Sequence, residues 1–146
     1  MSTVQCILDH KGSEVFTVSP WTTVRDAAKM MTDHRVGGLV VTRGCHIEGI
    51  VTERDVLRRV VAPGMDAATV VVRDVMTDEV VCCEPSTDID AARSIMKQRR
   101  IRHLPVVDPD NQLLGLISIG DLNAWAIDEQ KLALHYMQEY LYGSGV

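Results

Sequence analysis

The sequence predicts an α/β protein of the α+β type, in which two β-α-β-β-α repeats pack with pseudo-twofold symmetry and a C-terminal amphipathic helix follows. The first observation is internal repetition, because a shift of 65 residues superposes Pro20 on Pro85 and Met31 on Met96. The second is that both copies show the same succession of strand-like and helix-like apolar patterns. The third is a composition of 46% hydrophobic and 24% charged residues, which is typical of a folded globular chain.

Each copy is expected to open with a short apolar strand that ends before a proline, followed by a helix. The strands are predicted over residues 15–18 and 80–83. The expected helix N-caps are Thr22 or Thr23 in the first copy and Thr87 in the second, with Asp90 three residues after Thr87 as in a capping box. The residues that mark one apolar face of these helices are Val24, Ala27, Ala28 and Met31, and then Ile89, Ala92, Ile95 and Met96.

A β-hairpin and a second helix complete each copy. The paired strands are predicted over residues 38–41 and 47–51, and over residues 104–107 and 113–117. The second helices begin at Thr52 and Ser118. The expected division is a first repeat over 4–61, a linker over 62–73, a second repeat over 74–127, and a C-terminal helix and tail over 128–146. A unit of about 60 residues buries little surface alone, so the copies are expected to form one body.

Charge and composition exclude several classes of protein. With 15 Lys+Arg against 20 Asp+Glu, the net charge of −5 argues against affinity that comes mainly from nucleic-acid phosphates. The apolar runs are much shorter than the roughly 20 residues that span a bilayer, and no secretory signal is visible, so we expect a cytoplasmic protein without a membrane partner. The four cysteines lack zinc-ligand or disulfide-framework spacing, and we expect free thiols and no metal.

The junctions before the second helices carry one motif twice. The chain reads Gly-Ile-Val-Thr-Glu-Arg-Asp at 49–55 and Gly-Leu-Ile-Ser-Ile-Gly-Asp at 115–121, each after an apolar strand. Together with the lead-in at 74–77 and the run at 102–106, this resembles the tandem cystathionine-β-synthase-type repeat, known as the CBS pair or Bateman module, over residues 4–127. The resemblance implies an adenosine nucleotide in the clefts between repeats and a head-to-head homodimer.

The chemistry of the junction suits such a ligand. The hydroxyls of Thr52 and Ser118, with the free N–H groups of a helix start, favour a phosphate. Asp55 and Asp121, one turn further, can each accept two hydrogen bonds from a ribose diol. Gly37, Gly38 and Pro105 would let an adenine approach the strand backbone. The alternative is that both motifs are only helix capping boxes, and the two interpretations are compatible.

Basic residues distinguish the two copies. Arg54 lies inside the first motif, next to Glu53, and Arg102 and His103 precede a strand of the second copy. Arginine suits bidentate phosphate contacts, so these groups are expected at a phosphate-binding entrance, and the Thr52 cleft is expected to bind phosphorylated ligands more tightly. The full set of predicted nucleotide-binding residues is Lys11, Val15, Gly38, Val40, Thr52, Glu53, Arg54, Asp55, Val80, Arg102, His103, Pro105, Ser118 and Asp121.

No catalytic motif stands out, so ligand sensing is preferred to catalysis. AMP is the first expectation, with ADP, ATP, NAD(H) or S-adenosylmethionine as alternatives, no further cofactor, and an unidentified protein partner that responds to occupancy. The other hypothesis is a dimeric scaffold that binds no nucleotide. Residues 124–142 predict an amphipathic helix, ended by residues 143–145, whose apolar side either forms an interface or packs on its own subunit.

Overall fold

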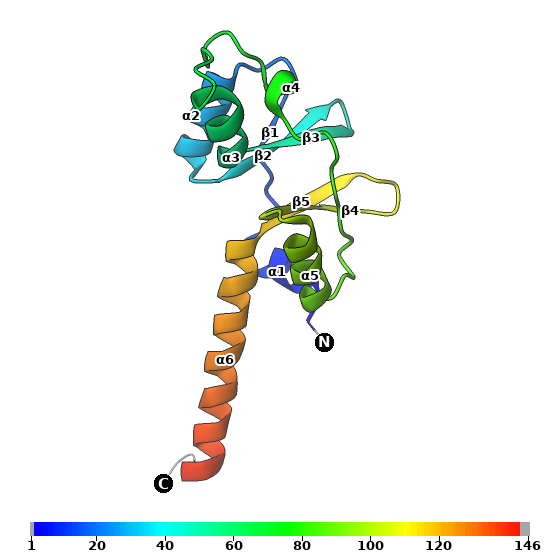
Figure 1. Ribbon diagram of the computed structural model, residues 1–146. Coiled ribbons are helices and arrows are strands. Elements are labelled where there is room, and N and C mark those ends of the chain that lie inside the picture. The colour runs from blue at the N-terminus through cyan, green and yellow to red at the C-terminus, as the bar shows by residue number, and fades with distance from the viewer. Residues whose placement is uncertain (1, 144–146) are drawn as a thin grey trace.

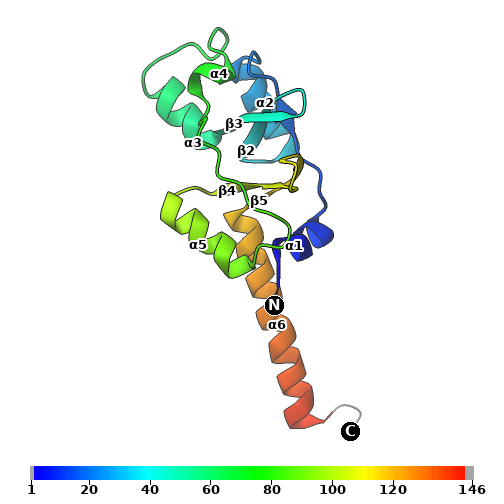
Figure 2. The same cartoon turned by 90° about the vertical axis from the view of Figure 1, so that its right-hand side faces the viewer.

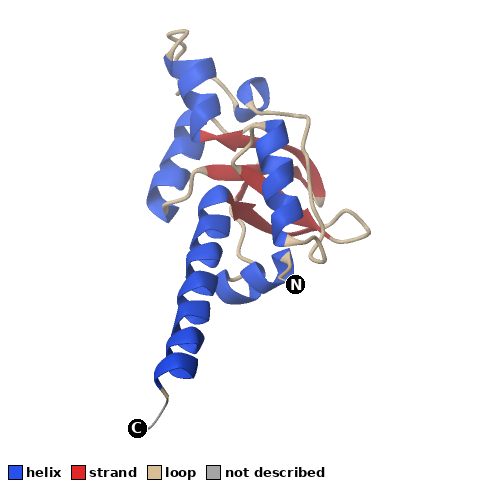
Figure 3. Ribbon diagram, turned by 60° about the horizontal axis from the view of Figure 1, so that its bottom comes forward, coloured by secondary structure: helices blue, strands red, loops and turns tan. Residues whose placement is uncertain are grey.

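The computed structural model describes residues 2–143, which form two α+β lobes and a long terminal helix (Figure 1). The strands of the two lobes face each other in the middle, and the helices lie mainly on the outside (Figures 1 and 3). The first lobe contains β1 (Thr17–Val18), α2 (Val24–His34), β2 (Gly38–Arg43), β3 (His46–Thr52), α3 (Glu53–Val56), the π-helical turn η1 (Leu57–Val61) and α4 (Val72–Val75). The second lobe contains α1 (Val4–Lys11), α5 (Ile89–Arg99), β4 (His103–Val107), β5 (Leu113–Ser118) and α6 (Ile119–Tyr142).

Each lobe is built on a small sheet. In the first lobe β1 pairs with β2 in parallel and β2 pairs with β3 antiparallel; in the second lobe β4 pairs with β5 antiparallel. The register places Gly38 opposite Thr52 and His103 opposite Ser118, so the strand residues that precede each second helix lie at equivalent sheet edges. The predicted hairpins and the starts of both second helices are confirmed.

The strand predicted over residues 80–83 is wrong, and that over 15–18 shortens to Thr17–Val18. In the first lobe the N–H of Val40 donates to the carbonyl of Phe16 over 3.3 Å. The equivalent residue in the second repeat is Pro105, which has no N–H to donate. Within residues 80–83, Cys83 alone therefore pairs with β4, through its N–H to the Pro105 carbonyl and its carbonyl to the Val107 N–H, each 2.9 Å.

The helix caps agree with the prediction in the first repeat and differ in the second. Thr23 caps α2 by accepting from the N–H of Asp26 over 3.2 Å. Thr87 does not cap α5, because its hydroxyl accepts from the N–H of Glu84 and closes the preceding turn. The carboxylate of Asp88 is the N-cap acceptor instead and takes the N–H of Asp90 at 2.7 Å.

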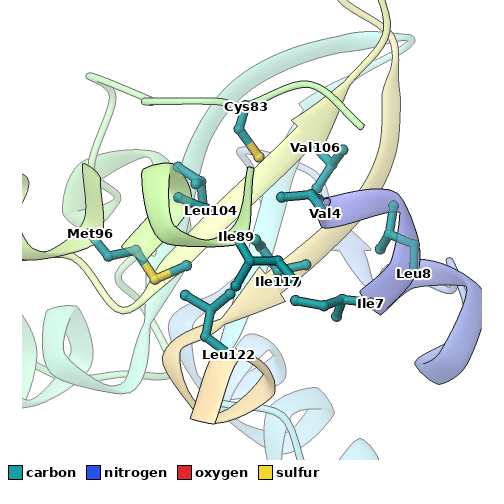
Figure 4. Close-up of a cluster of buried hydrophobic side chains, with 11 residues drawn as sticks. Val4, Ile7, Leu8, Cys83, Ile89, Met96, Leu104, Val106, Ile117 and Leu122 are labelled. Atoms are coloured by element: carbon teal, nitrogen blue, oxygen red, sulfur yellow. The ribbon is translucent and has the colours of Figure 1, made fainter. Parts of the chain in front are cut away.

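Two helical segments do not pack with the repeat that follows them in the chain. Each packs with the other repeat. α1, which the sequence did not predict, packs against β5 and α6 of the second lobe; Figure 4 shows its side chains pointing into that cluster. α4 packs in the first lobe. The second-lobe cluster is Val4, Ile7, Leu8, Cys83, Ile89, Ala92, Met96, Leu104, Val106, Ile117 and Leu122. The first-lobe cluster is Val18, Val24, Ala27, Met31, Leu39, Val41, Val51, Val60, Val70, Val72 and Val75.

The glycines of the repeated motif allow these segments to approach the sheets. A Cβ on Gly49 would lie 2.6 Å from the sulfur of Met76 and 2.8 Å from the carbonyl oxygen of Thr77. A Cβ on Gly115 would lie 2.7 Å from Cδ2 of Leu8 on α1. A Cβ at either position would come closer than 3.0 Å to a neighbour, so each glycine allows close packing, against the Thr77 backbone at Gly49 and against the end of the Leu8 side chain at Gly115.

The predicted C-terminal helix is confirmed and is longer than expected. It is continuous with the second helix of the repeat and runs for 24 residues before Gly143, whose N–H donates to the carbonyl of Glu139. Its distal part extends away from both lobes (Figure 2). The rest of the predicted tail, residues 144–146, lies outside the described residues. Among the helices described, none is long and apolar enough to cross a membrane.

Candidate functional site

Both motif junctions form complete capping boxes, as one of the two sequence interpretations expected. In the first, Thr52 Oγ1 accepts from the N–H of Asp55 over 3.3 Å, and Asp55 Oδ2 accepts from the N–H of Thr52 over 3.0 Å. In the second, Ser118 Oγ accepts from the N–H of Asp121 over 3.1 Å, and Asp121 Oδ2 accepts from the N–H of Ser118 over 2.8 Å. These bonds hold each carboxylate at a helix start.

The two carboxylates nevertheless have different surroundings. Asp55 is 9% exposed, and within residues 2–143 its Oδ1 accepts only from the hydroxyl of Thr77, 3.3 Å away. A carboxylate oxygen can accept two hydrogen bonds, so Asp55 keeps acceptor capacity for a ligand. Asp121 instead forms an ion pair with the ammonium of Lys11, whose Nζ lies 2.7 Å from Oδ2 and also donates to the carbonyl of Leu116 over 2.8 Å.

A cleft of about 830 Å³ lies between the lobes beside the first junction. That volume lies within the range of roughly 300–1,000 Å³ that small-molecule sites usually have. The predicted site residues that line it are Thr52, Glu53, Arg54, Asp55, Val80, Arg102, His103, Pro105 and Ser118. The predicted residues that do not line it are Lys11, Val15, Gly38, Val40 and Asp121.

The charge of this cleft is mostly positive. Arg54, Arg58, Arg100 and Arg102 line it, and none of them forms a salt bridge to a residue in the described part of the chain. Arg59 also borders the cleft, but its guanidinium donates to the carbonyls of Val75 and Met76 at the end of α4. The acidic residues on the wall are Glu53, Asp55 and Glu79. Four arginines without an internal partner make the cleft suited to an anionic group.

His103 of β4 lines the cleft and packs against the first lobe. Its imidazole would lie 3.3 Å from a Cβ on Gly38 and 3.5 Å from one on Gly37, so the space beside these glycines holds this ring. Burial lowers the pKa of His103, opposed by the charge of Glu53 and reinforced by that of Arg102. The neutral imidazole is therefore favoured in the folded protein.

Sequence reasoning did not select Thr77 and Glu79, although both line the cleft. Thr77 bonds to Asp55 across 22 residues of chain and pairs with Ile50 through a β-bridge. The comparison of repeats gave no signal, because the residue equivalent to Thr77 in the first copy is Gly12.

All four cysteines are free, as expected, and burial raises the pKa of Cys83 to about 12.

The fold and the site define a class of protein: two similar α+β repeats in tandem, with a cleft of ligand size between them. The family model for the CBS domain matches residues 10–62 and 72–128, and the chain belongs to this family. It is 34% identical over 97% of its length to the mitochondrial CBS domain-containing protein CBSX3 of Arabidopsis thaliana, covering 73% of that protein. It is 38% identical to YhcV of Bacillus subtilis, covering 80% of this chain and 81% of YhcV.

Solved structures share the fold. A protein with CBS domains from Burkholderia ambifaria is 42% identical and superposes with a TM-score of 0.85, covering 88% of this chain and 96% of that one. A CBS domain pair crystallised with 5′-methylthioadenosine and S-adenosyl-L-methionine is 21% identical and superposes with a TM-score of 0.76 over 85% of this chain and 98% of that one.

Proposed function

We propose that this protein is a sensor that binds an adenosine nucleotide in the cleft between its lobes, with AMP as the first candidate. The observation that carries the proposal is the meeting of Asp55 and the unpaired arginines in one cavity. Asp55 would accept the ribose hydroxyls through its Oδ1, and arginines such as Arg54 and Arg102 would bind the phosphate. ADP, ATP, NAD(H) and S-adenosylmethionine are the other candidates.

We infer that the two motif sites bind ligand unequally. The Lys11 ammonium already offsets the charge of Asp121, and Asp121 does not line the cleft, whereas Asp55 lines the cleft and has the neutral hydroxyl of Thr77 as its neighbour. The phosphate of the first-site ligand also meets Arg54, where the second motif has Gly120. We therefore assign the main nucleotide site to the Thr52–Asp55 junction.

A protein of similar fold supports the choice of an adenosine compound as ligand. The CBS pair solved with 5′-methylthioadenosine and S-adenosyl-L-methionine holds two adenosine derivatives. The proposed role in this chain is sensing rather than catalysis, because the hydroxyls of Thr52 and Ser118 serve as helix caps, and Asp55, the carboxylate to which the Thr52 hydroxyl donates, belongs to the same capping box. A cytoplasmic protein partner that reads occupancy is part of the proposal.

The chain is also proposed to self-associate, with α6 as the contact between two copies. The distal part of this helix leaves eight large apolar side chains more than half exposed, namely Ile127, Leu132, Leu134, Tyr136, Met137, Tyr140, Leu141 and Tyr142. They lie on more than one side of the helix, so a second copy would cover the side that faces it. Ile127, Leu134 and Leu141 recur at seven-residue intervals, as in helices that pair with each other.

Thermal unfolding with a panel of adenosine compounds tests the nucleotide proposal. A ligand at 100 times its dissociation constant stabilises the folded state by about 2.7 kcal/mol, whereas a scaffold without a nucleotide site shows no shift with any compound.

Calorimetric titration of Arg54→Ala with AMP and with adenosine then tests the phosphate contact. AMP should lose about tenfold or more in affinity and adenosine little. Equal losses for the two compounds would exclude Arg54 from the phosphate site.

A further inference from the structure

A second cavity adjoins the nucleotide cleft, over the end of α5 and the start of α6. Its volume is about 450 Å³, and it shares Arg54, Arg100 and Arg102 with the cleft. Lys97 and Arg93 line this second cavity and do not line the cleft. The shared lining residues place the two cavities next to each other.

The charge of the second cavity is one-sided. Five of the residues that line it are Arg or Lys, and no Asp or Glu lines it. Arg93 is held by Asn123 and by the carbonyl of Leu122, whereas Lys97 and Arg100 form no ion pair with any described residue. The cleft itself carries Glu53, Asp55 and Glu79, so positive charge without compensation increases from the cleft toward this cavity.

Local structure explains why the cations gather there. Arg100 ends α5 in the left-handed conformation, with φ 55°, and its N–H donates to the carbonyls of Met96 and Lys97. This turn brings Arg100 and Arg102 close to the helix end that already carries Lys97. Cations at a helix C-terminus are favoured by the helix dipole, but a dipole does not require that they line a common cavity with Arg54 of the other repeat.

We propose that the second cavity, the Lys97 groove, binds the terminal phosphates of a nucleotide that carries two or three phosphates. This rests on the proposed function, because the nucleoside and its first phosphate occupy the cleft. Each added phosphate brings negative charge, and the Lys97 groove supplies cations next to the cleft. The protein then distinguishes AMP from ATP by the groove, and both compounds share the Asp55 contact.

Titration of Lys97→Gln with AMP, ADP and ATP in metal-free buffer tests this assignment. Because Lys97 lines only the groove, the ratio of ATP affinity to AMP affinity should fall by about three- to tenfold, with AMP affinity itself unchanged. ADP should give an intermediate change. Lys29→Gln on α2 is the matched control, since it removes the same charge from an exposed lysine that lines neither cavity.

The possible results separate the subsite from the function. If wild-type protein binds AMP and ATP and Lys97→Gln leaves their affinity ratio unchanged, the groove is not a phosphate subsite, although the nucleotide proposal stands. If no adenosine compound binds the wild-type protein, the proposed function fails and the subsite fails with it. Tripolyphosphate that binds as tightly as ATP would also overturn the inference, because the groove would then act without the nucleoside cleft.

Discussion

The ammonium of Lys11 lies 2.7 Å from Oδ2 of Asp121, which gives the second motif carboxylate an internal cation that the first lacks. Lys11 lies at the end of α1, and 110 residues of chain separate the pair. The corresponding partner of Asp55 is the neutral hydroxyl of Thr77. Two motifs that look equivalent in the sequence therefore differ in the charge beside the carboxylate that a ribose would meet.

Asp55→Ala should weaken AMP binding at least tenfold, whereas Asp121→Ala should change it less than about threefold. Each substitution removes one capping box and costs about 1 kcal/mol of stability, so each serves as the structural control for the other. Isothermal titration calorimetry measures the affinities, and thermal unfolding verifies that both variants fold. Equal weakening by the two substitutions would show that both motifs bind the nucleotide.

Gly49→Ala should destabilise the protein more than Gly115→Ala. The added methyl at 49 meets the Thr77 backbone at 2.8 Å, and a backbone that bridges to Ile50 cannot move without breaking its hydrogen bonds. The methyl at 115 meets the flexible end of Leu8. We expect a loss of about 1–3 kcal/mol for Gly49→Ala and less for Gly115→Ala. Denaturant unfolding measures both, and the reverse order would contradict the packing described for α1 and Thr77.

Leu134→Glu combined with Met137→Glu should raise the dissociation constant for self-association by tenfold or more, because each places a charge in the apolar surface of α6. Gln138→Glu is the control on the same exposed helix and should have little effect. Sedimentation equilibrium compares the variants with a chain that lacks residues 128–146. If all of them dissociate at the same concentration as the wild-type protein, α6 does not form the contact between copies.

Folding stability should depend on the protonation of His103. Its pKa is lowered in the folded state from an ordinary value of 6.5, so the unfolded chain binds the proton more readily. The contribution of His103 is therefore fully present above pH 6.5 and is lost as the pH falls through the lowered folded-state pKa. The surrounding charges are Glu53, Arg102, Asp121 and Lys11.

The measurement is the difference in unfolding free energy between wild-type protein and His103→Gln at several pH values. That difference should shrink as the pH is lowered from neutral, because only the wild-type protein has the imidazole to protonate. A difference that stays constant across the range would show that the ring titrates normally.

Local pattern was sufficient for much of the architecture. The repeat, the hairpins, the helix starts at Thr52 and Ser118 and the presence of a C-terminal helix all depend on contacts within a turn or between adjacent strands. Propensity and apolar spacing report such contacts directly. The same locality explains an error: the strand at 80–83 reads as apolar, but whether it pairs depends on Pro105, a residue that only the pairing register places beside it.

The remaining features depended on how distant segments pack. The position of α1 in the second lobe, the ion pair of Lys11 with Asp121 and the contact of Thr77 with Asp55 join residues that no spacing rule connects. The cleft also depends on tertiary packing, because its walls come from both repeats and form only when the lobes face each other. Side-chain chemistry could name Arg54 and Asp55 as ligands, but burial and pairing, which distinguish Asp55 from Asp121, are properties of the tertiary structure.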